Sequence, residues 1–433
     1  MARKPFIPNR PRAASRVPGP QSQAQLQRLA SEFIAAMNAG RHADACRLAE
    51  QALAMAPGNP SVLGDYALCL MRDGRHEAAY RVYRQIEALP AEQRQQVKST
   101  WIDGMAEVCG WLGKADELRR YGQRSLQAAD ARYRTHRRWD IPARAPLPFD
   151  ASQPSRNIIA YSLYGDSPRY GESAVMNARI AADLFPGWTC RFYLDDSVPA
   201  HIAQRLRAAH AQVVVVDDTT QRTMPGTMWR FLVLDDPTVD RFMVRDADSL
   251  LSEREVPAIA AWIESGRWFH HMRDYFTHTE LLLAGMWAGC RGIFPPIAPL
   301  IESYARTQPA GYRFTDQYFL REWLWPTIRE SLLSHDELFD FHSPEPFPPH
   351  PPVRWQGAAF HVGSNASYRR VGGPSSLADG MKQTVFLTHE GDHALRYDVT
   401  VAQGQWRLDL PFFLIDAFQA GRLTIGLAPA TPG

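Results

Sequence analysis

The sequence has few cysteines, and none of them has the spacing of a metal site or a disulfide framework. Five cysteines are scattered over 433 residues without a Cys-x-x-Cys pair, so we expect reduced, buried thiols. No apolar run approaches the about 20 residues that a membrane-spanning helix needs. Residues 1–24 are rich in Arg, Pro and Ser and lack an apolar segment, which predicts a disordered arm and not a signal peptide.

An excess of charge of one sign is also missing. The 48 basic residues nearly balance the 46 acidic ones, and the formal net charge is +2. This balance gives no electrostatic case for nucleic acid or a membrane surface as the main partner. A length of 433 residues exceeds one domain of usual size. We therefore expect two or more folded units in a cytoplasmic protein.

Proline and glycine are scarce between residues 25 and 128, where long apolar periods predict consecutive amphipathic helices. Two helix pairs turn at Gly40 and Gly74, which lie 34 residues apart, the period of a helix-turn-helix repeat. Ala45 and Ala79 each follow one of these glycines by five positions, where two helices must pack closely. The four predicted helices are Leu26–Asn38, His42–Met55, Val62–Arg72 and His76–Leu89.

The segment from Ala49 to Pro57 resembles the end of a tetratricopeptide repeat, and a third, degenerate unit is predicted around Gly113. Such repeats bury their faces against their neighbours and offer a concave surface for binding. We therefore expect residues 25–137 to dock a partner protein, with a purely structural role as the alternative. Residues 138–154 contain four prolines and little periodic pattern, which predicts a linker.

After the linker, predicted strands alternate with predicted helices, which indicates an α/β fold with a parallel sheet and right-handed crossovers. We expect strands at Asn157–Leu163, Thr189–Leu194, Gln212–Val216 and Arg241–Arg245, and helices at Glu172–Phe185 and Ala200–Ala209.

The first of these strands ends in Tyr161-Ser162-Leu163-Tyr164-Gly165. Because this turn lacks the Gly-x-Gly-x-x-Gly pattern, a standard dinucleotide fold is disfavoured. Tyr161 or Tyr164 could stack on a base, and Ser162 could hydrogen-bond a ribose or uracil edge. Ordinary packing explains either tyrosine equally well.

Two aspartates, Asp246 and Asp248, follow the apolar strand Arg241–Arg245. They would lie at its carboxyl end, where ligands bind in open α/β sheets. Adjacent carboxylates repel each other unless a cation or several donors hold them, and a divalent metal is the simplest solution. Helix capping does not require these acids, because Ser252 and Glu255 already form a capping box for the next helix.

Four elements then follow in an order that resembles glycosyltransferases of the GT-A fold. They are Asp246-Ala247-Asp248, Leu283-Ala284-Gly285-Met286-Trp287, Asp316-Gln317 and His361-Val362-Gly363. The sequence is most similar to the glycogenin-like and lipopolysaccharide-galactosyltransferase-like retaining enzymes, in a divergent bacterial branch. The resemblance implies a Rossmann-like, nucleotide-sugar-binding GT-A domain over residues 155–374.

The resemblance also implies roles for particular residues. Asp246, Asp248 and His361 would bind Mn²⁺ or Mg²⁺, because carboxylates suit both ions and an imidazole favours manganese. The donor site would include Tyr161, Ser162, Tyr164, Arg230, Gly285 and Gly363. Asp316 would recognise the sugar, and Gln317 would stabilise the reacting face.

When a nucleotide sugar gives up its sugar, the leaving group is a nucleoside diphosphate, whose charge a hard cation neutralises. No acid in the sequence must act as a nucleophile, which fits transfer with retention. The resemblance departs from the family at Leu283, where glycogenin-like enzymes tend to carry Asn. The sugar therefore cannot be inferred, and retention or inversion stays open.

Residues 375–433 alternate apolar and polar positions between turn signals and predict a small β-rich extension, in which 408–418 fits a strand or a helix. The sequence thus predicts a metal-dependent transferase that moves a sugar from a nucleotide-sugar donor, a UDP-sugar, to the hydroxyl of a glycan, lipid-linked or protein acceptor. Two alternatives remain: an inactive GT-A protein that serves as an interaction scaffold, and a metal-dependent nucleotidyltransferase or phosphohydrolase.

Overall fold

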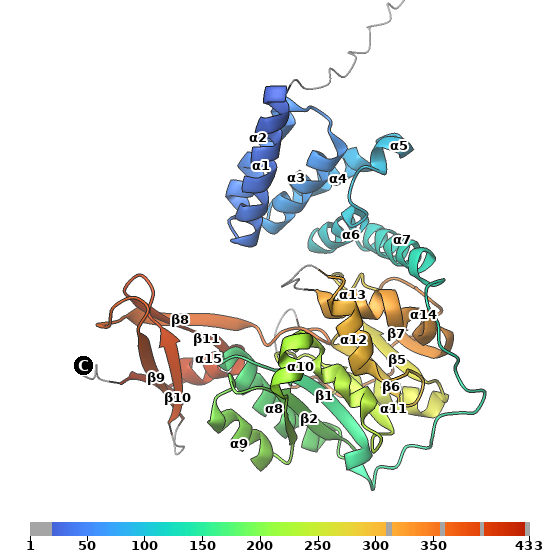
Figure 1. The fold of residues 1–433 in the computed structure, drawn as a ribbon, viewed down its shortest axis with the longest axis vertical. Coiled ribbons are helices and arrows are strands. Elements are labelled where there is room, and N and C mark those ends of the chain that lie inside the picture. Colours follow the sequence, from blue (N-terminus) through green and yellow to red (C-terminus); the bar gives the residue numbers. More distant parts are fainter. Residues whose placement is uncertain (1–19, 309–313, 356–359, 390–393, 429–433) are drawn as a thin grey trace, which may run out of the picture. The chain divides into compact units, whose positions relative to one another are not determined.

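The computed structural model describes residues 20–308, 314–355, 360–389 and 394–428. Residues 1–19, most of the predicted arm, lie outside the described residues. The chain forms two compact units, which divide between Tyr121 and Gly122. The predicted order of helical repeats, an α/β domain and a β-rich extension is confirmed (Figure 1).

The first unit consists of helices that pack in antiparallel pairs, α1 on α2 and α3 on α4. Gly40, Gly74 and Gly113 turn the chain with φ of +68°, +77° and +67°, a region that glycine enters without steric strain. Ala45 and Ala79, where close packing of two helices is predicted, are fully buried. The helices are α1 (Pro20–Asn38), α2 (His42–Met55), α3 (Pro60–Arg72), α4 (His76–Glu87), α5 (Ala91–Arg94), α6 (Trp101–Trp111) and α7 (Ala115–Tyr133).

Helix α1 begins at Pro20, so the last five residues of the predicted arm are helical. From Gly122 onward, α7 belongs to the second unit. A Cβ at Gly122 would overlap the ring of Phe339, and the carboxylate of Asp130 accepts hydrogen bonds from Trp325 Nε1 (2.8 Å) and Arg329 Nε (2.9 Å). The end of the repeat region is therefore part of the α/β unit's own packing.

A seven-stranded sheet in the order β3-β2-β1-β4-β6-β5-β7 forms the centre of the second unit. All neighbouring strands are parallel except at β6, which runs antiparallel to β4 and β5. The strands are β1 (Asn157–Leu163), β2 (Thr189–Leu194), β3 (Gln212–Val215), β4 (Arg241–Arg245), β5 (Phe269–Arg273), β6 (Met286–Cys290) and β7 (Leu332–Asp336).

The strand order places a binding crevice between β1 and β4. From β1 the chain proceeds outward through β2 and β3, and it then returns to place β4 on the other side of β1. The two strands are parallel, with Ile158 beside Phe242. The connections that leave the carboxyl ends of β1 and β4 therefore run in opposite directions along the sheet. In open α/β sheets, ligands bind in the crevice between two such strands.

Helices cover this sheet and connect its strands (Figure 1). They are α8 (Pro168–Leu184), α9 (Ala200–Ala208), α10 (Asp218–Thr223), η2 (Gly226–Asp235), α11 (Glu255–Ser265), α12 (Ile297–Ala305), α13 (Thr315–Phe319), η3 (Leu320–Leu324) and α14 (Trp325–Ile328), with short turns η1 (Pro154–Arg156) and η4 (Arg329–Ser331). The helical segment from Thr315 to Ile328 contains a π-helical turn, in which Trp325 N–H bonds to Leu320 O. Pro326 follows directly and has no N–H to continue the α-helical pattern.

The extension contains two antiparallel sheets, β10-β9-β12 and β11-β8. The segment predicted as strand or helix is both, since β11 ends at Pro411 and a helix begins at Phe412. Tyr397 hydrogen-bonds the Glu172 carboxylate of α8, which Arg205 also binds (2.6 Å). The elements are β8 (Tyr368–Pro374), β9 (Lys382–His389), β10 (Leu395–Thr400), β11 (Gln405–Pro411), α15 (Phe412–Gln419) and β12 (Leu423–Leu427).

Across the described ranges, none of the helices combines the length and the apolar character needed to cross a bilayer.

Candidate functional site

A cavity of about 220 Å³ opens at the carboxyl ends of β1 and β4. Five residues singled out from the sequence line it, although they come from three separate segments: Ser162, Tyr164, Arg230, Asp246 and Asp248. The sheet topology explains this convergence, because both strands end at the crevice where the strand order reverses. Leu163, Tyr170, Thr227 and Ala247 complete the lining.

Arg230 holds two carboxylates from different elements together. Its buried guanidinium binds Asp246, which follows β4, and Asp316 Oδ2 (3.0 Å) at the start of α13. Its backbone N–H donates to Ser162 Oγ (2.9 Å) at the end of β1. Burial alone would lower the pKa of Arg230, but the charges of the two aspartates outweigh it and raise that pKa. Arg230 is therefore a fixed positive charge at the floor of the cavity.

Asp316 is buried and acts through Arg230. Its Oδ1 accepts a hydrogen bond from Gln317 N–H (2.9 Å). Burial raises the pKa of Asp316 above its usual value, and the guanidinium of Arg230 opposes that rise. Asp316 thus contacts a residue that lines the cavity, and its predicted recognition of the sugar stays a prediction.

Asp248 is held by a second arginine, which the sequence analysis missed. Arg169, in the first turn of α8, donates to Asp248 Oδ2 (2.6 Å) and lies over the ring of Tyr368 at 4.2 Å. Burial, together with the charge of Asp246, raises the pKa of Asp248. The signal in the sequence was a basic residue shortly after the turn that ends β1, but nothing indicated its partner.

The two aspartates fit a hard divalent cation. Asp246 is 43% exposed at its side chain and faces the cavity with Asp248 beside it. Mg²⁺ and Mn²⁺ are commonly held by one or two carboxylates plus substrate phosphates, which this arrangement allows. Neither acid caps the next helix, because Glu255 accepts from Ser252 N–H (3.2 Å), as half of the predicted capping box.

Gly285 and Gln317 support the acids from behind. A Cβ at Gly285 would overlap Oδ2 of Asp246, so only glycine leaves this carboxylate its position. The side-chain amide of Gln317 accepts from Ala284 N–H (3.0 Å) and donates to Leu282 O. Both ends of the amide are therefore engaged by the backbone. Gln317 therefore positions the segment that carries Gly285, and its predicted role at the reacting face stays a prediction.

Tyr161 is not part of the cavity, contrary to the prediction. Its ring is fully buried and stacks on Phe192, with ring centroids 4.6 Å apart and planes 9° from parallel. Successive side chains of a strand point to opposite faces, and the neighbouring Ser162 is the one that reaches the cavity. Burial raises the pKa of Tyr161 well above its usual value. Tyr161 belongs to the core and does not contact a donor.

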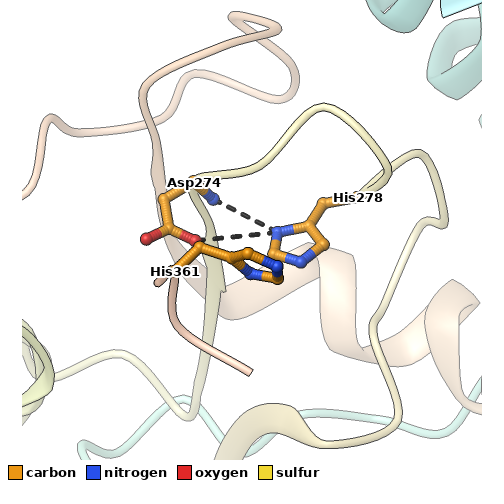
Figure 2. Close-up of side chains that lie close together, drawn as sticks. All are labelled: Asp274, His278 and His361. Carbon is orange, nitrogen blue, oxygen red and sulfur yellow. Dashed lines mark hydrogen bonds and ion pairs between the residues drawn. The ribbon is translucent and has the colours of Figure 1, made fainter. Parts of the chain in front are cut away.

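His361 does not join Asp246 and Asp248 in one ligand group. Within the described part of the chain, the three-residue group of possible metal ligands is Asp274, His278 and His361, whose ligand atoms lie within 4.8 Å of one another (Figure 2). Burial lowers the pKa of His361 and, more strongly, that of His278. The predicted set of Asp246, Asp248 and His361 is therefore not assembled, and the sequence analysis missed Asp274 and His278.

Gly363 shapes the segment that follows His361. Its φ is +77°, and a Cβ there would overlap Met286 Sδ. Its carbonyl accepts a hydrogen bond from Ser249 Oγ (2.9 Å), and Ala366 N–H donates to Asp248 O (2.6 Å). Gly363 thus fixes a segment beside the aspartates and is not among the residues that line the cavity.

One family model matches part of the helical repeat region. Residues 36–99 match the family model of the tetratricopeptide repeat. A search of curated protein sequences gives no match.

Two solved structures are similar at low TM-scores. A mutant of the O-GlcNAc transferase of Thermobaculum terrenum has 14% identity and a TM-score of 0.28, with 52% of this chain and 47% of that chain covered. The chain thus spans about half the length of that enzyme. Glucosyl-3-phosphoglycerate synthase from Mycobacterium tuberculosis, in complex with Mn²⁺, UDP and phosphoglyceric acid, has 12% identity and a TM-score of 0.27, with 64% and 99% covered.

Proposed function

We propose that this protein is a metal-dependent glycosyltransferase of the GT-A type that moves a sugar from a UDP-sugar to an acceptor hydroxyl. The observation that carries the proposal is the cavity between β1 and β4, where Ser162, Tyr164, Arg230, Asp246 and Asp248 come together. A nucleotide-sugar donor needs a surface for the base, a cationic environment for the diphosphate and polar groups for the sugar. The cavity offers all three from this chain's own residues.

The nucleoside would lie against the end of β1. Tyr164 is 43% exposed, and its ring is held edge-on by Trp229 with centroids 5.7 Å apart. Such a fixed, accessible aromatic face is suited to stacking on a base. Ser162 Oγ accepts from Arg230 N–H, so its hydroxyl proton remains to donate to a uracil or ribose oxygen.

The diphosphate would lie between the aspartates and the arginines. Asp246 and Asp248 would hold Mn²⁺ or Mg²⁺, which supplies neutralisation of the departing nucleoside diphosphate. Arg169 and Arg230 offer planar guanidinium groups that suit phosphate oxygens. Asp316 keeps Arg230 in place, and its buried carboxylate would act on the donor through that guanidinium.

The tetratricopeptide-like repeats would recruit a protein acceptor or a partner protein, since stacked helical pairs present extended binding surfaces. This part of the proposal rests on the family match of residues 36–99.

The test is a panel of nucleotide sugars incubated with the purified protein, with and without Mn²⁺, followed by analysis of the released nucleotide. We expect metal-dependent release of UDP from one UDP-sugar, and its loss in Asp248→Asn with the fold intact. Asp218→Asn is the control, because Asp218 is an exposed carboxylate on α10 that pairs with its helix neighbour Arg222 and does not line the cavity. Full activity of the wild-type protein in metal-free buffer would contradict metal dependence.

An inactive scaffold is the second candidate, and one observation favours it. Both aspartates are already paired with arginines, Asp246 with Arg230 and Asp248 with Arg169. A site neutralised in this way could be stable without any cation. Calorimetry with UDP and Mn²⁺ separates the two, because a scaffold that has lost donor binding gives no heat.

A further inference from the structure

The side chains of Asp274, His278 and His361 lie close together, although they come from two parts of the chain (Figure 2). Asp274 follows the last residue of β5, and His278 lies four residues later in the connection to β6. His361 lies more than eighty residues downstream, just before Val362 and Gly363. None of the three lines the cavity at β1 and β4.

The carboxylate of Asp274 is buried and only half satisfied. Its side chain is 4% exposed. Oδ2 accepts a hydrogen bond from Val362 N–H (3.1 Å) and lies 3.3 Å from Arg254 Nε. Oδ1 is buried and has no hydrogen-bond partner. A buried carboxylate oxygen without a partner is strongly unfavourable, so this atom points to a missing positive group.

His278 lies beside that same oxygen. Its Nδ1 accepts two long hydrogen bonds from the backbone N–H groups of Asp274 (3.3 Å) and Tyr275 (3.2 Å), so Nδ1 carries no proton in the neutral ring. It faces Asp274 Oδ1 at 3.7 Å (Figure 2). The single lone pair of Nδ1 is engaged by these two long hydrogen bonds, which an ion between Nδ1 and Oδ1 would displace. Two ligands of a tetrahedral ion about 2.1 Å from each are roughly 3.4 Å apart, close to this separation.

His361 is oriented as metal-bound histidines usually are. Its Nδ1 lies 3.0 Å from Val362 O, and because a carbonyl can only accept, Nδ1 carries the proton and Nε2 keeps its lone pair. The ring stacks on Tyr275, with centroids 3.8 Å apart, and meets His278 at 4.9 Å. The tautomer and the ring plane are thus both fixed.

We propose that Asp274, His278 and His361 bind a divalent transition-metal ion, best matched by Zn²⁺, at a site separate from the Asp246–Asp248 cation. Two imidazoles and one carboxylate suit zinc, whereas Mg²⁺ prefers oxygen ligands. The ion would tie the end of β5 to residues 361–366. Because that segment bonds Ser249 Oγ and Asp248 O, the ion would hold the backbone on which the donor site is built.

The test uses the full-length protein without a histidine tag, stripped with chelator, dialysed against Zn²⁺ and analysed for bound metal, with calorimetry of the Zn²⁺ titration. We expect one tightly bound Zn²⁺ per chain, and affinity at least about 100-fold weaker in Asp274→Asn and in His278→Gln. His342→Gln is the matched control, since His342 is another half-buried histidine that contacts a backbone carbonyl, Arg329 O (2.7 Å). It should bind Zn²⁺ like the wild type.

Absence of bound zinc in the wild type, or wild-type affinity in both ligand variants, overturns the proposal. If the variants fail to fold, zinc-edge X-ray absorption of the wild type decides, because the site predicts two imidazoles and no sulfur. Asp248→Asn separates this inference from the proposed function: it should lose Mn²⁺-dependent UDP binding and retain the zinc. A protein that binds zinc here but no UDP keeps the metal site and refutes only the transferase.

Discussion

Arg230 shows how a single side chain organises the candidate donor site. One guanidinium binds Asp246 from the end of β4 and Asp316 from α13, while its backbone fixes Ser162 of β1. The N–H donors of a guanidinium point in fixed directions within one plane, so the group can bind two carboxylates at once in a defined geometry. The spacing of these residues in the chain, from 162 to 316, gives no sign of this arrangement.

Gly285 gives a prediction at the scale of one atom. In Gly285→Ala the new Cβ would displace the Asp246 carboxylate, so we expect a loss of stability of about 1–3 kcal/mol. Affinity for Mn²⁺ with UDP should fall by about tenfold, measured by calorimetry. Gly426→Ala is the control, because a Cβ at Gly426 meets nothing within 4 Å. Unchanged metal affinity in Gly285→Ala would show that Asp246 is not a ligand.

At the scale of elements, the buried strands β5 and β7 meet through two histidines. His270 Nε2 and His335 Nδ1 share a hydrogen bond of 2.7 Å in the core. Burial lowers the pKa of His335 to about 4. Burial, together with the neighbouring His335, lowers the pKa of His270 well below its usual value. Both rings are therefore neutral in the folded protein at neutral pH.

This pair predicts acid sensitivity. Between pH 6.5, the ordinary histidine value, and pH 4, the unfolded chain binds protons that the folded chain excludes. Stability should be complete above pH 6.5 and fall as the pH drops, by at most about 1.4 kcal/mol per pH unit for each histidine. Urea unfolding at several pH values measures the slope. His335→Leu should flatten it, and an unchanged slope in this variant would assign the acid sensitivity to other groups.

The same strands mark the limit of what the sequence could predict. β1, β2 and β4 were predicted with the bounds that the structure shows, because their apolar runs need no partner to be recognised. β5 contains three buried polar residues, each with a hydrogen-bond partner. His270 pairs with His335, His271 accepts from Leu283 N–H, and Arg273 donates to Asp336. A strand with three polar residues reads as exposed until those partners are known.

The candidate site divides in a similar way. Asp246, Asp248 and Ser162 could be placed from sequence, because strand ends meet at one edge of a sheet. Tyr161 was wrongly assigned, since a shift of one position along a strand exchanges the cavity for the core. His361 was wrongly grouped because its ring direction depends on Val362 O and Tyr275, which place it beside Asp274 and His278. The motif order identifies which segments matter, but it does not determine where a loop side chain points.

For the whole molecule, the division between Tyr121 and Gly122 predicts where the α/β unit can be separated. A fragment that begins at the predicted linker, residue 138, loses Gly122 beside Phe339 and the Asp130 contacts to Trp325 and Arg329. A fragment that begins at residue 115 keeps them. We expect the free energy of unfolding of the longer fragment to be larger by several kcal/mol, which is on the order of the cost of breaking one buried charge pair.

Thermal unfolding of the two fragments measures the difference. Asp130→Asn in the longer fragment should reproduce part of the loss, since it weakens the acceptor but retains the helix. Equal melting temperatures for the two fragments would mean that α7 contributes nothing to the second unit.

The pairing of both aspartates with arginines has a consequence for how ligands enter. In the proposed donor site, a cation alone would have to displace guanidinium groups, and a diphosphate alone would have to draw them from their carboxylates. If both bound, Asp246 and Asp248 would hold the metal and Arg169 and Arg230 would bind the phosphates, so each ligand would favour the binding of the other. Mn²⁺ should therefore tighten UDP binding, and UDP should tighten Mn²⁺ binding by the same factor, about 5–150-fold. Arg169→Gln should reduce this coupling, and calorimetric titration of each ligand in the presence and absence of the other measures it.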